Sequence, residues 1–368
     1  MSDAYRRYRA IRQALMQCFP VRSHSRAEQH LNTLTMLICG IVGSEQVHLP
    51  RIADHAPGGK TAHESQVIRY RRWLMNESIG IQEWMLPVAQ ALLHALAAQP
   101  LRLVMDGSTV GRGCMCLMVS VVYHGRALPL VWMVVEGKKG HLREELHCEL
   151  LALVQTIMPP EATVVFLGDG EFDGTTLQTR LQQAGWLYVC RTASNILVTA
   201  FDRQFALNKV PLCSGQAKEI SPAWMTVAEF GPVHLLAVWD EAYTEPIYLV
   251  TNIAEPEAAL AYYRLRATIE TLFSDQKSRG FHIQRSHLAD PQRLSRLLIA
   301  SCLAYIWIIY LGVQASHDHW RGRLHRRTRC DLSLFQLGRR FLAFCLREGE
   351  AIPNGLIVPP ALPASLLL

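Results

Sequence analysis

Residues 101–135, LRLVMDGSTVGRGCMCLMVSVVYHGRALPLVWMVV, decide the fold class of this chain. Apolar and β-branched residues dominate the stretch, and glycines divide it at intervals that suit turns between strands. We predict three strands over residues 101–105, 114–123 and 128–135. A turn at residues 124–126 would join the last two, so the three strands would form a meander.

Helices and further strands alternate after this meander. We expect a helix over residues 141–157, a strand over 162–167, a helix to residue 185 that Asp173 caps, and a short strand over 186–191. The resulting order is β-β-β-α-β-α-β. It predicts an α/β fold with a mixed sheet and flanking helices.

Two aspartates come directly after predicted strands. Asp106 follows residues 101–105, and Asp169 follows residues 162–167 with a glycine on either side. Carboxylates at such strand ends are poorly hydrated, and converging ones raise each other's pKa unless a cation neutralises them. Oxygen ligands without paired Cys or His favour Mg²⁺ or Mn²⁺ over zinc.

Two neighbouring acids compete with Asp169 for a role at this strand end. Glu171 and Asp173 both lie in the turn that follows the strand. Capping of the next helix explains Asp173, and only Asp169 directly follows the strand. We therefore prefer Asp169.

A third acid lies in residues 256–279, which have the apolar periodicity of a helix. Tyr263, Arg266, Glu270 and Lys277 follow one another there at spacings of three, four and seven. At about 100° per residue they fall within an arc of about 60°, so one helix face would carry an aromatic ring, two cations and a carboxylate. That face suits a phosphate and a metal ion, although a solvated charge stripe is the alternative.

The order Asp106, Asp169, Glu270, with Tyr-x2-Arg-x3-Glu-x6-Lys around the glutamate, resembles the Asp-Asp-Glu transposases of bacterial insertion sequences. It is most similar to the group with the Tyr-Arg-Glu-Lys signature, often called insertion-sequence-four-like. The resemblance spans roughly residues 101–313.

This resemblance implies a domain organisation. An all-helical DNA-binding domain would occupy residues 1–98 and a ribonuclease H-like catalytic domain residues 99–313, with a β-rich insertion at about 192–247. Residues 314–368 would form a basic and apolar C-terminal region. In the insertion, Trp224 and Trp239 are candidates for stacking on an unpaired base, and core packing is the alternative.

The resemblance also implies a reaction and its partners. Asp106, Asp169 and Glu270 would be the catalytic residues and would hold two Mg²⁺ ions, with Mn²⁺ as a possible substitute. The enzyme would cut the ends of an insertion sequence and join the 3′-hydroxyl ends to target DNA by two-metal phosphoryl transfer, commonly through a hairpin. Its partners would be double-stranded terminal inverted repeats, target DNA and a second copy of the chain in a synaptic complex.

DNA-binding candidates follow from the signature and from basic residues elsewhere. Arg266 and Lys277 would hold phosphate oxygens, and Tyr263 would contact the strand beside the cut. The further candidates are Arg191, Arg285, Arg69 and Arg72. Five arginines between residues 321 and 329 form the densest basic patch; they could track DNA or belong to a solvated loop.

The N-terminal hundred residues are predicted to be helical. Ser25 with Glu28 and Thr61 with Glu64 have the spacing of capping boxes. The second of these helices, residues 62–74, ends in a basic run that includes Arg69 and Arg72. The run suits DNA phosphates, and a solvated helix end is the equal alternative.

Composition agrees with a folded cytoplasmic protein that binds a polyanion. Half of the 368 residues are hydrophobic, and 37 Lys and Arg against 31 Asp and Glu give a net charge of +6. The ten cysteines show no repeated Cys-x-x-Cys, which favours reduced thiols in a cytoplasm. The resemblance to bacterial transposases implies a bacterial, nucleoid-associated location. The apolar run at residues 297–313 is short for a membrane span and predicts a buried core helix, so we expect no membrane partner.

Two other classes of function share these features. A metal-dependent DNA nuclease would use the same acids but would not join the cut ends. A non-catalytic DNA-binding protein derived from a transposase would keep the fold alone, and the presence of Asp106, Asp169, Glu270 and Lys277 argues against it.

Overall fold

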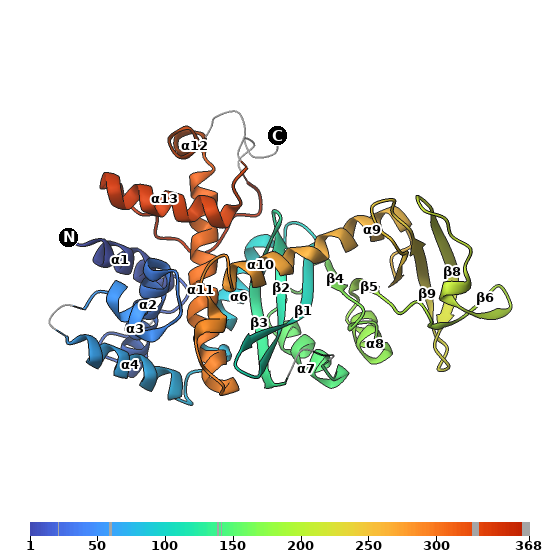
Figure 1. Ribbon diagram of the computed structural model, residues 1–368, viewed down its shortest axis with the longest axis horizontal. Helices are drawn as coiled ribbons and strands as arrows, with labels where there is room; N and C mark the ends of the chain where they lie inside the picture. The colour runs from blue at the N-terminus through green and yellow to red at the C-terminus, as the bar shows by residue number, and fades with distance from the viewer. Residues whose placement is uncertain (21, 59–60, 138–139, 141, 326–330, 363–368) are drawn as a thin grey trace.

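The chain is elongated, with a helical part at one end and a β-rich lobe at the other (Figure 1). A computed structural model describes residues 1–20, 22–58, 61–137, 140, 142–325 and 331–362. It is a mixed α/β protein with one ten-stranded mixed sheet, in the order β3-β2-β1-β4-β5-β10-β9-β8-β6-β7. The predicted α/β class is confirmed.

The first half of the sheet contains the predicted meander. Its strands are β1 (Leu101–Gly111), β2 (Cys114–Tyr123), β3 (Arg126–Glu136), β4 (Val164–Gly168) and β5 (Leu187–Arg191). β2 is antiparallel to both β1 and β3, whereas β4 is parallel to both β1 and β5. This arrangement of five strands is consistent with a ribonuclease H-like fold.

Helices connect the parallel strands. α7 (Glu144–Gln155) lies between β3 and β4, and α8 (Thr175–Gln183) lies between β4 and β5. The predicted order of elements from β1 to β5 is therefore confirmed, with α8 beginning later than we predicted. β2 is buried along its whole length, because helices cover the sheet on both faces.

The β-rich lobe extends the same sheet. Its strands are β6 (Leu197–Ala200), β7 (Arg203–Ala206), β8 (Ala217–Met225), β9 (Phe230–Val238) and β10 (Ile247–Thr251), with a short 3₁₀ turn, η1 (Leu207–Lys209), before β8. β10 pairs with both β5 and β9 in antiparallel fashion, so the lobe is continuous with the central sheet.

Six helices form the N-terminal part: α1 (Asp3–Met16), α2 (Arg26–Ser44), α3 (Leu49–His55), α4 (His63–Met75), α5 (Ile81–Trp84) and α6 (Leu86–Leu96). Ser25 caps α2 as predicted, because its hydroxyl accepts the Glu28 N–H at 3.1 Å. The capping box predicted at Thr61 is wrong. α4 begins after Ala62, which has no side chain that could cap it.

The chain returns from the β-rich lobe through a run of helices: α9 (Pro256–Arg264), the 3₁₀ turn η2 (Leu265–Ala267), α10 (Thr268–Gln276), the 3₁₀ turn η3 (Ile283–Arg285), α11 (Pro291–Ala315), α12 (Asp318–Leu324) and α13 (Leu334–Glu348). α11 runs between the N-terminal helices and the sheet (Figure 1). It packs against α2, α13 and β3 and thereby joins the two parts.

α11 is also the helix that contains the long apolar run. Among the residues that the structure describes, it is the one helix long and apolar enough to cross a membrane, and 89% of its most apolar window is buried inside the fold. The predicted buried core helix is confirmed.

Candidate active site

Sheet pairing places Asp106 and Asp169 side by side. β1 and β4 are neighbours, and the last residues paired between them are Val104 and Leu167. Both aspartates lie just beyond this pair, on adjacent parallel strands, as the sequence predicted. β1 itself continues past Asp106, however, because its pairing with β2 extends to Gly111 and Cys114.

The charge of Asp169 acts on Asp106. Burial and, after it, the charge of Asp169 raise the pKa of Asp106 to about 6, against the lowering effects of the Gly107 N–H and Arg266. Asp106 Oδ1 accepts the Gly107 N–H at 2.7 Å, and Asp169 Oδ1 accepts the Glu171 N–H at 2.9 Å. Asp106 is thus fixed by the next residue of β1, and Asp169 by the turn that follows β4.

Glu270 reaches the same place from α10 through Arg266. Arg266 Nη2 donates to Glu270 Oε1 at 2.5 Å, and its Nη1 lies 3.9 Å from Asp106 Oδ2. The side chain of Glu270 is 58% exposed, whereas that of Asp106 is 16% exposed. Arg266 therefore bridges a half-buried and an exposed carboxylate.

The donor set suits a hard divalent cation. Within the described part of the chain, no three His, Cys, Asp or Glu side chains are close enough together to hold a metal ion as they stand. Arg266 supplies the positive charge between two of the carboxylates, Asp106 and Glu270. If Glu270 released Arg266 and turned toward Asp106, the three carboxylates would supply the oxygen ligands that Mg²⁺ prefers.

The signature residues do not lie on one continuous α-helix. The 3₁₀ turn η2 separates Tyr263 on α9 from Glu270 on α10, and Lys277 is the residue after α10 rather than part of it. The prediction of a single helix over residues 256–279 is wrong in this respect. Arg266 and Lys277 nevertheless reach β1, where Arg266 Nη1 lies 3.9 Å from Asp106 Oδ2 and Lys277 contacts Ser108.

Lys277 contacts a residue that sequence reasoning did not select. Its Nζ donates to Ser108 Oγ at 2.6 Å. Ser108 lies inside β1, which continues past residue 105, where we predicted that the strand ends. The two-residue spacing from Asp106 was the available signal, since alternate residues of a strand share a face.

A cavity of about 510 Å³ adjoins α9 and η2. It contains Tyr263 and Arg266 and, from the end of β5, Arg191. Burial raises the pKa of the Tyr263 hydroxyl, and the charges of Arg266 and Arg191 oppose that rise. The other lining residues are Val238, Asp240, Tyr243, Thr244, Glu245, Ile247, Leu260, Arg264 and Ala267.

The rival acids have other partners. Glu171 Oε1 accepts the Leu142 N–H at 2.6 Å and lies 3.3 Å from His147 Nε2. Asp173 Oδ2 accepts the Thr192 hydroxyl at 2.7 Å. Glu171 thus contacts α7 and the residues before it, and Asp173 contacts the residue that follows β5.

The prediction that Asp173 caps α8 is wrong. The residue at the N-cap is Gly174, and the capping acceptor is Glu144 Oε1, which binds the Leu177 N–H at 2.8 Å.

The remaining DNA-binding candidates are exposed. Arg285 lies on η3, which packs against β1. Arg69 and Arg72 lie on α4 and line a groove of about 420 Å³ with polar residues of α2. Most of the basic patch between residues 321 and 329 falls outside the described residues.

The two tryptophans of the β-rich lobe are half-buried and do not line the cavity beside Tyr263. Trp239 Nε1 donates to the Tyr243 carbonyl at 3.1 Å, and the ring of Trp224 packs against Gly231.

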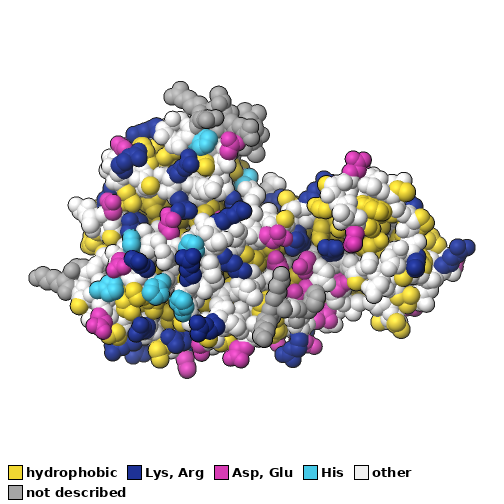
Figure 2. All heavy atoms as spheres, in the orientation of Figure 1, with side chains coloured by type: hydrophobic (Ala, Val, Ile, Leu, Met, Phe, Trp, Pro, Cys, Tyr) yellow, Lys and Arg dark blue, Asp and Glu magenta, His cyan; other side chains and the backbone are white. Residues whose placement is uncertain are grey.

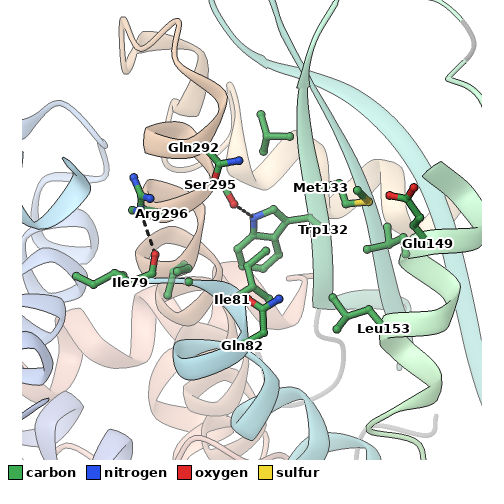
Figure 3. A pocket seen from close by; sticks show the side chains of 14 residues that line it. Ile79, Ile81, Gln82, Trp132, Met133, Glu149, Leu153, Gln292, Ser295 and Arg296 are labelled. Carbon is green, nitrogen blue, oxygen red and sulfur yellow. Dashed lines mark hydrogen bonds between the residues drawn. The ribbon is translucent and has the colours of Figure 1, made fainter. Parts of the chain in front are cut away.

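A second cavity, of about 410 Å³, shares no residue with the carboxylate centre (Figure 3). It lies where α5, β3, α7 and α11 meet. Trp132 Nε1 donates to Ser295 Oγ at 3.1 Å on its wall, and Arg296 donates to the Ile79 and Leu74 carbonyls at 3.0 Å. Arg296 is thus a buried link between the helical part and α11.

Comparison with known proteins gives one family. The profile of a family described as transposase DDE domain matches residues 96–307. A cryo-EM structure of a piggyBac transposase synaptic complex with hairpin DNA is similar in fold, with a TM-score of 0.49 and 12% identity over 96% of this chain and 83% of that chain. No curated protein matches the sequence.

Proposed function

The chain belongs to the family of proteins with a transposase DDE domain, whose profile covers residues 96–307, and on this premise we propose that it cuts and joins DNA at Asp106, Asp169 and Glu270. The observation that carries the proposal is the meeting of the two aspartates at adjacent strand ends, with Arg266 bridging to Glu270. The finer assignment to the insertion-sequence-four-like group rests on Tyr263, Arg266, Glu270 and Lys277 at the signature spacing.

Asp106, Asp169 and Glu270 would hold two Mg²⁺ ions, or Mn²⁺ in their place. When bound, the ions lower the pKa of an attacking water or 3′-hydroxyl and stabilise the departing 3′-oxygen. The same carboxylates would serve cutting and joining, because the two steps differ only in which hydroxyl attacks. Asp106 and Asp169 are held by backbone N–H groups of Gly107 and Glu171, and Glu270 is the ligand that would move.

The cations of the site would exchange partners when DNA binds. Arg266 would leave Glu270 for a phosphate oxygen, for which its planar fork is suited, and Lys277 would contribute a point charge. Tyr263 and Arg191 line the adjoining cavity and would contact the strand beside the cut. Arg285 on η3 would contact the DNA backbone farther from the cut.

The N-terminal helices would bind the terminal repeats. The groove between α2 and α4 is lined by Gln29, His30, Asn32, Thr33, Arg69, Arg72, Trp73 and Asn76, and no acidic residue is among them. Amides suit base edges and arginines suit phosphates. In Figure 2 acidic side chains gather near the middle of the face drawn, and basic ones are numerous on the helical part.

We keep three parts as a working division: a DNA-binding part at residues 1–98, a catalytic part at 99–313 with its insertion at about 192–247, and a C-terminal region at 314–368. Synapsis of two element ends calls for two copies of the chain on DNA. A cytoplasmic, nucleoid-associated location follows from the same role.

The experiment incubates the purified chain with its flanking inverted-repeat DNA, target DNA and Mg²⁺. We expect cleavage and joining by the wild type and neither by Asp169→Ala. Asp173→Asn is the matched control, since it lies in the same turn and can still accept the Thr192 hydroxyl. Equal products from wild type and Asp169→Ala would remove Asp169 from the mechanism, and cutting without joining would favour a nuclease.

A further inference from the structure

We infer that Ser108 is a positioning residue, which fixes the ammonium group of Lys277 against β1 beside the carboxylate centre. The inference rests on the proposed function, in which Lys277 contacts a phosphate. It adds a residue outside the Tyr-Arg-Glu-Lys signature to the parts of the site on which the reaction depends.

The contact joins two elements that carry catalytic acids. Lys277 Nζ donates to Ser108 Oγ at 2.6 Å, although the two residues are 169 positions apart in the sequence. Ser108 lies two residues after Asp106 on β1, and Lys277 lies seven residues after Glu270, at the end of α10. The hydrogen bond therefore links the strand of one acid to the end of the helix that carries the other.

Strand register places the hydroxyl on the same face as the Asp106 carboxylate. Asp106 pairs with Met118 and Ser108 pairs with Cys116, with no bulge between the two pairs. Residues two apart on a strand point to the same side of the sheet. The Ser108 hydroxyl thus lies next to the metal-binding face, toward the helix that brings Glu270.

The backbone of Lys277 is already fixed, so the hydroxyl acts on the side chain alone. The Lys277 N–H donates to the carbonyls of Phe273 at 3.0 Å and Ser274 at 3.2 Å, which ends α10. Its Nζ also lies 5.8 Å from the centre of the Phe273 ring. The ring and the hydroxyl together restrict a flexible four-carbon side chain from two directions.

Such restriction matters for a lysine more than for an arginine. An ammonium is a point charge on a stem with several rotatable bonds, and it loses that rotational freedom when it binds a phosphate. A neutral hydroxyl orients the ammonium and leaves its charge intact. The charge is therefore in place before DNA arrives, which is how fixed groups contribute to transition-state stabilisation.

The test is a double-mutant cycle between Ser108→Ala and Lys277→Ala, measured as the rate of cleavage at saturating DNA. We expect Ser108→Ala to lower the rate about tenfold, through the loss of one charge-assisted hydrogen bond. In the Lys277→Ala background the same change should have no further effect. Ser108→Thr, which keeps the hydroxyl, should retain activity.

Thr109→Ala is the matched control, because Thr109 is the next residue on β1 and points to the other face. Thermal unfolding of each variant separates a loss of folding from a loss of positioning. Wild-type activity in Ser108→Ala, or an equal loss with and without Lys277, would overturn the inference.

The same cycle is also measured as DNA affinity in the presence of EDTA, where no cleavage occurs. Coupling between Ser108 and Lys277 is expected there as well, and additive losses of affinity would overturn the inference. This arm keeps the two proposals distinguishable. If the wild type binds DNA but never cuts it, the proposed function is wrong. The double-mutant cycle measured as DNA affinity would still decide the role of Ser108.

Discussion

Arg266 is the residue whose position has the most direct chemical consequence. It pairs with Glu270 and approaches Asp106, so it competes with any cation for those carboxylates. We predict that Arg266→Gln binds Mn²⁺ more tightly than wild type in the absence of DNA, by roughly threefold to tenfold, because Glu270 is released. The same variant should cleave DNA about a hundredfold more slowly, since it lacks a phosphate contact.

Calorimetric Mn²⁺ titration and single-turnover cleavage measure the two effects. Arg264→Gln is the control, because Arg264 lines the same cavity and is exposed. Weaker Mn²⁺ binding by Arg266→Gln would show that the arginine supports the metal ligands instead of competing with the ion.

At the same scale, the sequence identified side chains whose role follows from local position and missed those whose role depends on a distant partner. Asp106 and Asp169 were found because each lies at the end of an apolar run. Ser108 was missed because its partner, Lys277, is 169 residues away. Asp173 was misassigned for a similar reason, since the acceptor that caps α8 is Glu144.

At the scale of elements, α10 is held against the sheet by a buried ion pair. Asp275 Oδ2 accepts from Arg126 Nη1 at 2.8 Å, yet burial outweighs this attraction and raises the pKa of Asp275 to about 6. The folded state therefore binds a proton more readily than the unfolded chain, whose aspartates titrate near 3.9. Asp275 should lower the free energy of unfolding as pH rises from about 4 to 6, by at most about 3 kcal/mol.

Urea unfolding of wild type and Asp275→Asn at several pH values between 4.5 and 6.5 measures this effect. The asparagine cannot titrate, so the difference in unfolding free energy between the two proteins should shift in favour of the variant as pH rises. A difference that does not change with pH would mean that Arg126 keeps the carboxylate ionised throughout.

The elements themselves were predictable where they are long and periodic. Two strands of the meander, β2 and β3, and helix α11 agree with prediction because continuous apolar runs specify them. β1 was predicted too short, because Asp106, Gly107 and Ser108 look like a turn in isolation and only pairing with β2 keeps them extended. The η2 turn was missed since residues 265–267 have ordinary helix-forming side chains.

Across the whole molecule, the α2–α4 groove and the carboxylate centre lie in different parts joined by α11. We predict that changing Arg69 and Arg72 together to Gln weakens DNA binding and reduces the slope of log affinity against log salt by about 1.8, since each lost phosphate contact removes about 0.9. Cleavage of DNA that is already bound should be unaffected, because these residues are far from the metal ligands.

Fluorescence anisotropy over a series of salt concentrations measures the slope. Arg347→Gln is the control, because this exposed arginine of α13 pairs with Glu348 and lies outside the groove. An unchanged slope in the Arg69 and Arg72 variant would place the DNA on another surface.

The central claim is that Glu270 joins Asp106 and Asp169 around shared metal ions once DNA takes Arg266. Mn²⁺ titration of the DNA-bound protein, wild type against Glu270→Gln, tests it most directly. We predict two bound ions for the wild type and the loss of at least one of them in the variant. The same number of ions, bound with the same affinity in both proteins, would contradict the claim.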